Sequence, residues 1–103
     1  MAEADFDAAG VRIRRMLRSL TRGGHVLVRD GRLVLMTSYG SEIDSAPLDQ
    51  VRISGYGARD TAMARLGGTR YLLQFGLGRR EGLLSAVRTA RAKAAADRGA
   101  LGH

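Results

Sequence analysis

The apolar positions of residues 5–22 gather on one side of a helical wheel. At about 100° per residue they span an arc of about 100°, the width expected of a helix face that packs on a core. Asp5 suits the N-cap position, and Gly23 suits the position just after a helix. The apolar members of this face are Phe6, Ala9, Ile13, Met16, Leu17 and Leu20. The pattern therefore predicts an amphipathic leading helix within residues 1–23.

From residue 24 the periodicity changes to that of strands. The segment HVLVRDGRLVLMTS places two β-branched and aliphatic runs around Asp30-Gly31. Asp-Gly favours a type I′ turn, in which both central residues have positive φ. A β-hairpin is therefore predicted here.

Three more strands are expected before residue 77. EIDSAPL contains a short strand with Pro47 at an edge or an end, since proline cannot donate to a sheet ladder. QVRISGY alternates as a half-buried strand does, and TRYLLQFG places Tyr71, Leu73 and Phe75 on one face. Residues 59–66, RDTAMARL, fit either a strand or a helical turn. We expect a mostly antiparallel sheet over residues 24–76.

The last segment, residues 79–98, has helical periodicity that ends at Gly99. Its apolar stripe consists of Leu83, Ala86, Val87, Ala90 and Ala94. The small alanines would allow a close approach to a sheet. The chain of 103 residues is thus expected to form one α+β domain. Its predicted order is an N-terminal amphipathic helix, four to six mostly antiparallel strands and a C-terminal helix packed on the sheet.

Composition narrows the function. There is no cysteine, which removes disulfide frameworks, thiol catalysis and cysteine-based zinc sites. No apolar run is long enough for a signal peptide or a membrane span, so we expect a cytoplasmic protein that does not insert into membranes. The net charge of +7 permits phosphate-bearing or acidic protein partners.

The sequence offers little catalytic chemistry. In FGLGRREG the third glycine, Gly82, comes one residue late for a dinucleotide-binding G-x-G-x-x-G motif. Backbone N–H groups there, together with Arg79 and Arg80, could still hold a phosphate or carboxylate. His25 and His103 have no neighbouring ligands at metal spacing, and no G-x-S-x-G elbow occurs. We expect no cofactor, no metal and no enzymatic activity.

Two sets of contact residues follow from the helical wheel. The apolar face of the leading helix is expected to cover its own sheet or another chain. Val11 lies apart from this face, among the arginines on the polar side of the predicted helix. Only a contact with a partner would explain an apolar side chain at that position. The predicted protein interface consists of Val11, Ile13, Leu17 and Leu20. The predicted nucleic-acid or anion contacts on this helix are Arg12, Arg15, Arg18 and Arg22.

The stretch from His25 to Lys93 resembles bacterial PH-like domains. The resemblance rests on the hairpin HVLVRDGRLVLMTSYG, on PLDQV before a later strand, and on RYLLQFG leading into the helix REGLLSAVRTARAKAA. It implies a strongly bent sheet or small barrel, a helix over one end, and binding of peptide, protein or anion at an edge. The first hairpin turn is too tight for a long basic lipid-binding loop, so phosphoinositide binding is not carried over.

These observations favour a non-catalytic binding or assembly module that acts through protein–protein contacts, including self-association. The alternative is a basic protein that binds nucleic acid or an anionic surface through the arginines of the first helix. The sequence leaves open the identity of the partner, the oligomeric state, and whether the first helix packs on its own chain.

Overall fold

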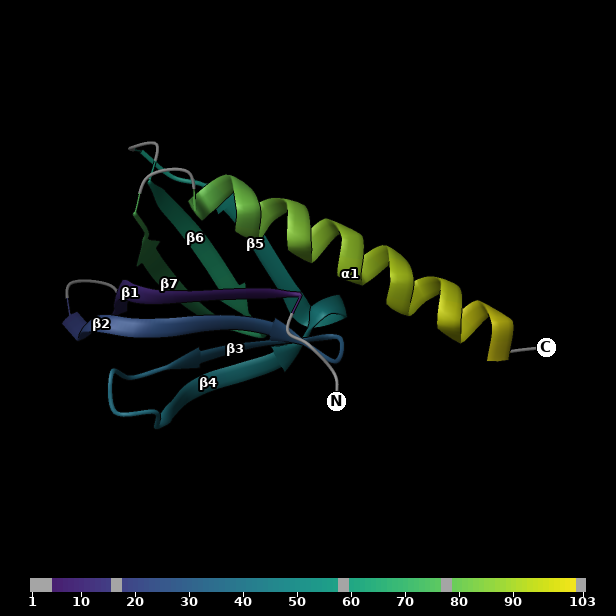
Figure 1. Ribbon diagram of the computed structural model, residues 1–103, viewed down its shortest axis with the longest axis horizontal. Helices are drawn as coiled ribbons and strands as arrows, with labels where there is room; N and C mark the ends of the chain where they lie inside the picture. The colour runs from purple at the N-terminus through teal and green to yellow at the C-terminus, as the bar shows by residue number, and fades with distance from the viewer. Residues whose placement is uncertain (1–4, 16–17, 58–59, 77–78, 102–103) are drawn as a thin grey trace.

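The computed structural model describes residues 5–15, 18–57, 60–76 and 79–101, which form one antiparallel sheet and one long helix (Figure 1). The strands are β1 (Phe6–Arg15), β2 (Arg18–Arg29), β3 (Arg32–Met36), β4 (Glu42–Pro47), β5 (Val51–Gly55), β6 (Thr61–Leu66) and β7 (Thr69–Gln74). A 3₁₀ turn, η1 (Leu48–Gln50), joins β4 to β5, and the helix α1 (Arg79–Leu101) follows β7. The sheet order is β4-β3-β2-β1-β7-β6-β5, so β4 and β5 are its two edges and the sheet is not closed.

The predicted N-terminal helix is wrong. Residues of that segment instead form β1 and the first part of β2, which pair antiparallel across the middle of the sheet. Gly23 does not end a helix but lies inside β2. The described part of the sheet therefore begins at Phe6 rather than at residue 24, and it has seven strands rather than four to six.

The pattern of buried and exposed side chains along β1 shows why this segment is a strand and not a helix. Ala8, Val11 and Ile13 are buried, while Arg12 is exposed. Strand residues alternate between two faces, and a β-bulge shifts that alternation by one residue. The pairing of β1 with β2 shifts register between Ala8 and Val11, where Gly10 has a φ of 68°. The bulge turns Val11 inward, which resolves its odd place on the helical wheel.

The hairpin at Asp30-Gly31 is confirmed. Asp30 has φ 54° and Gly31 has φ 73°, as a type I′ turn requires. The turn joins β2 to β3 with Arg29 opposite Arg32. The backbone N–H of Leu48 donates to Gly31 O at 2.9 Å, so η1 is tied to this turn.

The later strands also follow the sequence pattern. Pro47 ends the edge strand β4, as expected. Of the ambiguous segment, residues 61–66 form β6, which pairs with both β5 and β7. A strand outcompetes a helical turn here because β6 gains hydrogen-bonded neighbours on both sides.

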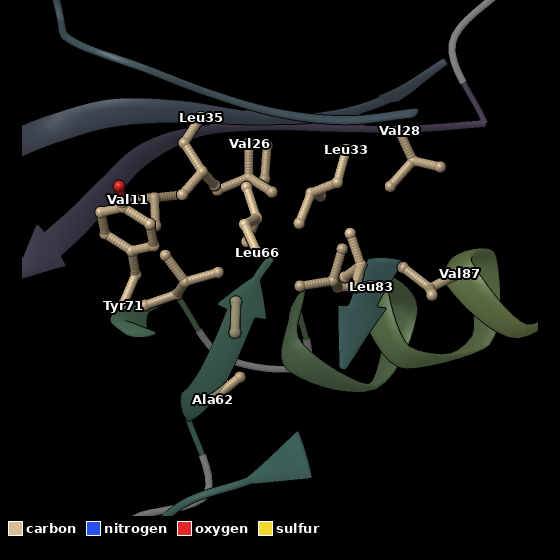
Figure 2. Close-up of a cluster of buried hydrophobic side chains, with 14 of the residues drawn as sticks. Val11, Val26, Val28, Leu33, Leu35, Ala62, Leu66, Tyr71, Leu83 and Val87 are labelled. Atoms are coloured by element: carbon tan, nitrogen blue, oxygen red, sulfur yellow. The ribbon is translucent and has the colours of Figure 1, made fainter. Parts of the chain in front are cut away.

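The bent sheet encloses the core together with α1. Figure 2 shows side chains of Val11, Val26 and Leu35 pointing toward Leu66 and Tyr71 from the other half of the sheet. Leu83 and Val87 of α1 enter the same interior (Figure 2). Among the described residues no charged side chain is buried. The helix begins at Arg79, as predicted, but reaches Leu101 rather than residue 98.

The first turn of α1 sits close to the start of β1. The rings of Phe6 and Phe75 meet edge-on, with centroids 6.3 Å apart and planes at 81°. A Cβ at Gly82 would lie 3.3 Å from the Phe6 ring. The absence of a side chain at Gly82 therefore allows this aromatic pair to pack under the helix.

Candidate functional site

The edge strand β5 has backbone groups that face away from the sheet. Gly67 N donates to Gln50 O, and Tyr56 N donates to Thr61 O, so the backbone groups of residues 50 and 56 face β6 and the turn that follows it. Neighbouring residues of a strand point their backbone groups to opposite edges. The N–H and C=O groups of Ile53 and Gly55 therefore point outward, on the side where the sheet has no further strand.

A groove lies between this edge and α1, which crosses over β5 in Figure 1. We call it the β5–α1 groove; its volume is about 440 Å³. Its helix side presents residues spaced three and four apart, which share one helix face. The lining residues are Ile53, Ser54, Leu84, Val87, Arg88, Arg91, Ala92 and Ala95.

Arg91 holds one end of the groove in place. Its Nε donates to Leu48 O at 3.2 Å, and its Nη2 donates to Val51 O. These two carbonyls belong to η1 and to the first residue of β5. A guanidinium that donates to backbone carbonyls forms strong, charge-assisted hydrogen bonds. Arg91 thus fixes the helix to the edge strand, and Arg88 is the exposed cation of the groove.

The predicted apolar interface is mostly inside the protein. Val11 is 1% exposed and Ile13 is 0% exposed, so both side chains belong to the core. Leu20 is half-buried and packs against that core. Leu17 lies outside the described residues. Ile13 therefore packs inside its own sheet and not against another chain.

The arginines predicted to form one helical stripe are separated. Arg12 is exposed in β1 opposite Gln74 of β7. Arg15 and Arg18 face each other at the end of the β1–β2 pair. Arg22 is exposed on β2. Two antiparallel strands spread these side chains over the sheet, whereas a helix would have aligned several of them.

Arg79 and Arg80, predicted to hold an anion, have different surroundings. Arg79 is exposed at the first position of α1. Arg80 Nη2 lies 3.0 Å from Glu81 Oε1, and Arg80 Nη1 donates to Thr61 O at 3.3 Å. The Arg80 guanidinium also lies beside Gly55, where a Cβ would come within 3.1 Å of its Nη1. Its guanidinium therefore joins α1 to β5 and β6.

One polar contact crosses the interior of the bent sheet. Tyr71 of β7 donates its hydroxyl proton to Asp44 Oδ2 of β4, at 2.8 Å. Burial, the hydrogen bond and the nearby negative charge of Asp44 raise the pKa of Tyr71 to about 12, while Arg15 acts in the opposite direction. The contact ties the β4 half of the sheet to the β7 half.

Sequence reasoning missed the β5–α1 groove. The alternation of QVRISGY located β5, and the helical periodicity located α1, but neither reveals that β5 is an edge or that α1 lies beside it. The one available signal was the extra apolar residue Leu84, which lies outside the predicted stripe of α1 and lines the groove.

Within residues 5–15, 18–57, 60–76 and 79–101, no cluster of three or more His, Cys, Asp or Glu side chains could hold a metal ion. No helix in this part combines the length and the apolar character that crossing a membrane requires. Of the tyrosines, Tyr39 is 95% exposed and Tyr56 is 50% exposed.

Comparison with known proteins supports a PH-like fold. A solved structure described as Vav1 inhibited by an allosteric inhibitor, with the statement that Vav1 inhibitors block GEF activity, aligns over 87% of this chain with a TM-score of 0.65. The identity is 15%, and the alignment spans 27% of the Vav1 chain. Vav1 includes PH-like domains, which supports a PH-like fold here. No family model matches the sequence, and no curated protein matches it either.

Proposed function

We propose that this protein is a non-catalytic module that binds an extended acidic segment of another protein in the β5–α1 groove. The proposal rests chiefly on one observation, which is the open edge of β5 beside an apolar groove. We also propose that it belongs to the bacterial PH-like domains that its sequence resembles.

Backbone geometry supports an extended ligand. A peptide that adds a strand to a sheet edge gains main-chain hydrogen bonds, while pockets for alternate side chains supply selectivity. Ile53 and Gly55 offer their N–H and C=O groups at this edge. Arg91 occupies the carbonyl of Val51, so the added strand would pair with the later part of β5.

The chemistry of the groove supports an acidic ligand with apolar side chains. Ile53, Leu84 and Val87 supply apolar surface, and Ala92 leaves room beside them. Arg88 is an exposed cation at the groove, and the whole chain has a net charge of +7. A carboxylate of the ligand near Arg88 would be attracted by the Arg88 guanidinium and by the net positive charge of the chain.

The test is selection from a displayed peptide library on the full chain, followed by NMR titration of the selected peptide. We expect shifts of the amide signals of Ile53 and Gly55 and of groove residues in α1. Ala92→Trp should abolish binding by filling the groove, and Arg88→Glu should weaken it about tenfold. Ala96→Trp and Lys93→Glu are matched controls, since both positions are exposed on α1 and do not line the groove.

Two results would contradict the proposal. One is a library that yields no peptide able to shift the Ile53 and Gly55 signals. The other is a dimer in sedimentation equilibrium that Ala92→Trp dissociates, because the groove would then hold a second copy of the chain.

A further inference from the structure

The outward face of the sheet half formed by β1, β7, β6 and β5 is strongly basic. Strand alternation and burial identify its residues, since the opposite side chains of these strands fill the core. We define the basic face by its arginines, which are Arg12, Arg14, Arg52, Arg65 and Arg70. No described Asp or Glu of these four strands lies alongside them; Asp7 is on the outward side of β1 but precedes the bulge at Gly10.

Three of these arginines stand in register. Arg52 pairs with Arg65 across β5 and β6, and Arg65 pairs with Arg70 across β6 and β7. Side chains directly opposite on neighbouring strands have Cβ atoms about 5 Å apart, where like charges destabilise a sheet. The chain therefore carries an arrangement that weakens its own fold.

Acidic side chains near this row, among the described residues, are fewer than its arginines. Asp49 lines a depression together with Arg52 and Arg65, which sets one carboxylate against two guanidinium groups. A second depression, beside the β6–β7 turn, is lined by Arg65 and Arg70 with Arg15, Gly68 and Thr69, so none of its described lining residues is acidic. A bound anion would relieve the repulsion within the row.

The rest of the face indicates which anion. Its neutral members include Ser54, Thr61 and Gln74, which can donate hydrogen bonds, whereas Met63 and Leu72 are half-buried. The exposed tyrosines, Tyr39 and Tyr56, lie outside these strands. Among the described residues of the face, the apolar side chains are only half-exposed and none is aromatic, so the face offers little to insert into a bilayer and no ring to stack on a base. It fits the repeated phosphates of a nucleic-acid backbone.

We infer that the basic face binds the phosphate backbone of nucleic acid without sequence preference. Arginine forms bidentate hydrogen bonds with phosphate, and such phosphate contacts set affinity rather than sequence selectivity. This surface is separate from the β5–α1 groove, so the inference does not depend on the proposed peptide binding.

The experiment measures fluorescence anisotropy of labelled duplexes of two unrelated sequences with the full chain, from about 50 to about 200 mM salt. Affinity should be similar for both sequences and should fall steeply with salt. Arg65→Gln/Arg70→Gln should reduce the slope of log K against log salt by about 2, since each lost phosphate contact removes about 0.9. Arg65→Lys/Arg70→Lys should retain most of that slope.

The matched control is Arg29→Gln/Arg32→Gln. It removes the same charge from another exposed cross-strand arginine pair, in the β2–β3 hairpin. This control should bind as the unmodified protein does. The inference is overturned by equal losses in both double variants, by a strong preference for one sequence, or by no binding at about 50 mM salt. It is also overturned if vesicles containing phosphatidylserine bind through Arg65 and Arg70 while the duplexes do not.

Discussion

At the scale of single residues, close approach of the backbone decides which side chains are allowed. A Cβ on Gly24 would lie 2.4 Å from Met36 O and 2.6 Å from Thr21 Cγ2. Gly24 is opposite Val11 of β1, and it belongs to the strand between β1 and β3. A side chain there would push apart the three strands that meet at this point.

We therefore expect Gly24→Ala to lower the free energy of unfolding by about 1–3 kcal/mol, as overpacking does. Gly23→Ala is the matched control, because a Cβ at Gly23 meets nothing within 4 Å. Urea denaturation followed by circular dichroism measures both. Equal stability of the two variants would show that the strands are not this close.

Val11 and Arg12 test the strand assignment of β1. Val11→Ala should lower the free energy of unfolding by about 2 kcal/mol, since it removes buried methyl groups and leaves a cavity. Arg12→Ala should change it by less than about 0.5 kcal/mol, because that side chain is exposed. The same denaturation experiment measures both, and a neutral Val11→Ala would argue against the inward position of Val11.

Tyr71 makes stability depend on pH at the alkaline end. Burial and the hydrogen bond to Asp44 raise the pKa of Tyr71 to about 12 in the folded protein, from 10.0 for an unperturbed tyrosine. A raised folded pKa stabilises the protein fully below the unfolded pKa, and this contribution disappears as pH rises through the folded pKa. The free energy of unfolding should therefore fall between about pH 10 and about pH 12. Tyr71→Phe should remove this part of the pH dependence, and an unchanged profile in that variant would refute the assignment.

At the scale of elements, α1 is attached to the sheet by a few specific contacts. Leu83, Val87 and Ala90 are buried against the core. Arg91 adds hydrogen bonds to Leu48 O and Val51 O. In Figure 1 the later turns of α1 extend beyond the sheet. The attachment of the helix therefore depends on its first three turns and on Arg91.

We expect Arg91→Ala to lower the free energy of unfolding by about 1.5–3 kcal/mol, the usual contribution of a hydrogen bond made by a charged group. Lys93→Ala, at an exposed position of the same helix, should have little effect. Hydrogen exchange should show faster exchange of α1 amides in Arg91→Ala than in Lys93→Ala. Unchanged protection of α1 would mean that the buried residues alone hold the helix.

At the scale of the whole molecule, charge opposes the compact fold. The net charge is +7, and part of it is concentrated in the row of Arg52, Arg65 and Arg70. Self-repulsion of like charges is screened by salt, with a Debye length of about 10 Å at 0.1 M. Repulsion within this basic surface is therefore expected to lower the free energy of unfolding.

The salt dependence of thermal unfolding should reveal this repulsion. We expect Tm to rise as sodium chloride increases from about 0.01 M to about 0.15 M, because screening weakens the repulsion. The rise should be smaller in Arg65→Gln/Arg70→Gln, whose Tm at low salt should already exceed that of the unmodified protein. A Tm independent of salt in both proteins would contradict this account.

The sequence by itself determined the elements whose signals are local. The Asp30-Gly31 turn, the strands around it, the end of β4 at Pro47 and the start of α1 were all predicted. Each depends on a turn residue or a periodicity that acts over a few positions. Two expectations stay predictions: that the chain is a single domain, and that it binds a partner and does not catalyse a reaction.

The tertiary structure decided the remainder. Residues 5–15 satisfy helical periodicity and, with a bulge at Gly10, strand periodicity as well, so only pairing with β2 and β7 selects the strand. The β5–α1 groove and the arginine row depend on which strands are neighbours, and strand order is set by contacts between residues far apart in the chain. No local pattern contains that information. For the same reason the sequence placed Arg12, Arg15, Arg18 and Arg22 on one helix, whereas the fold places them on the strands β1 and β2.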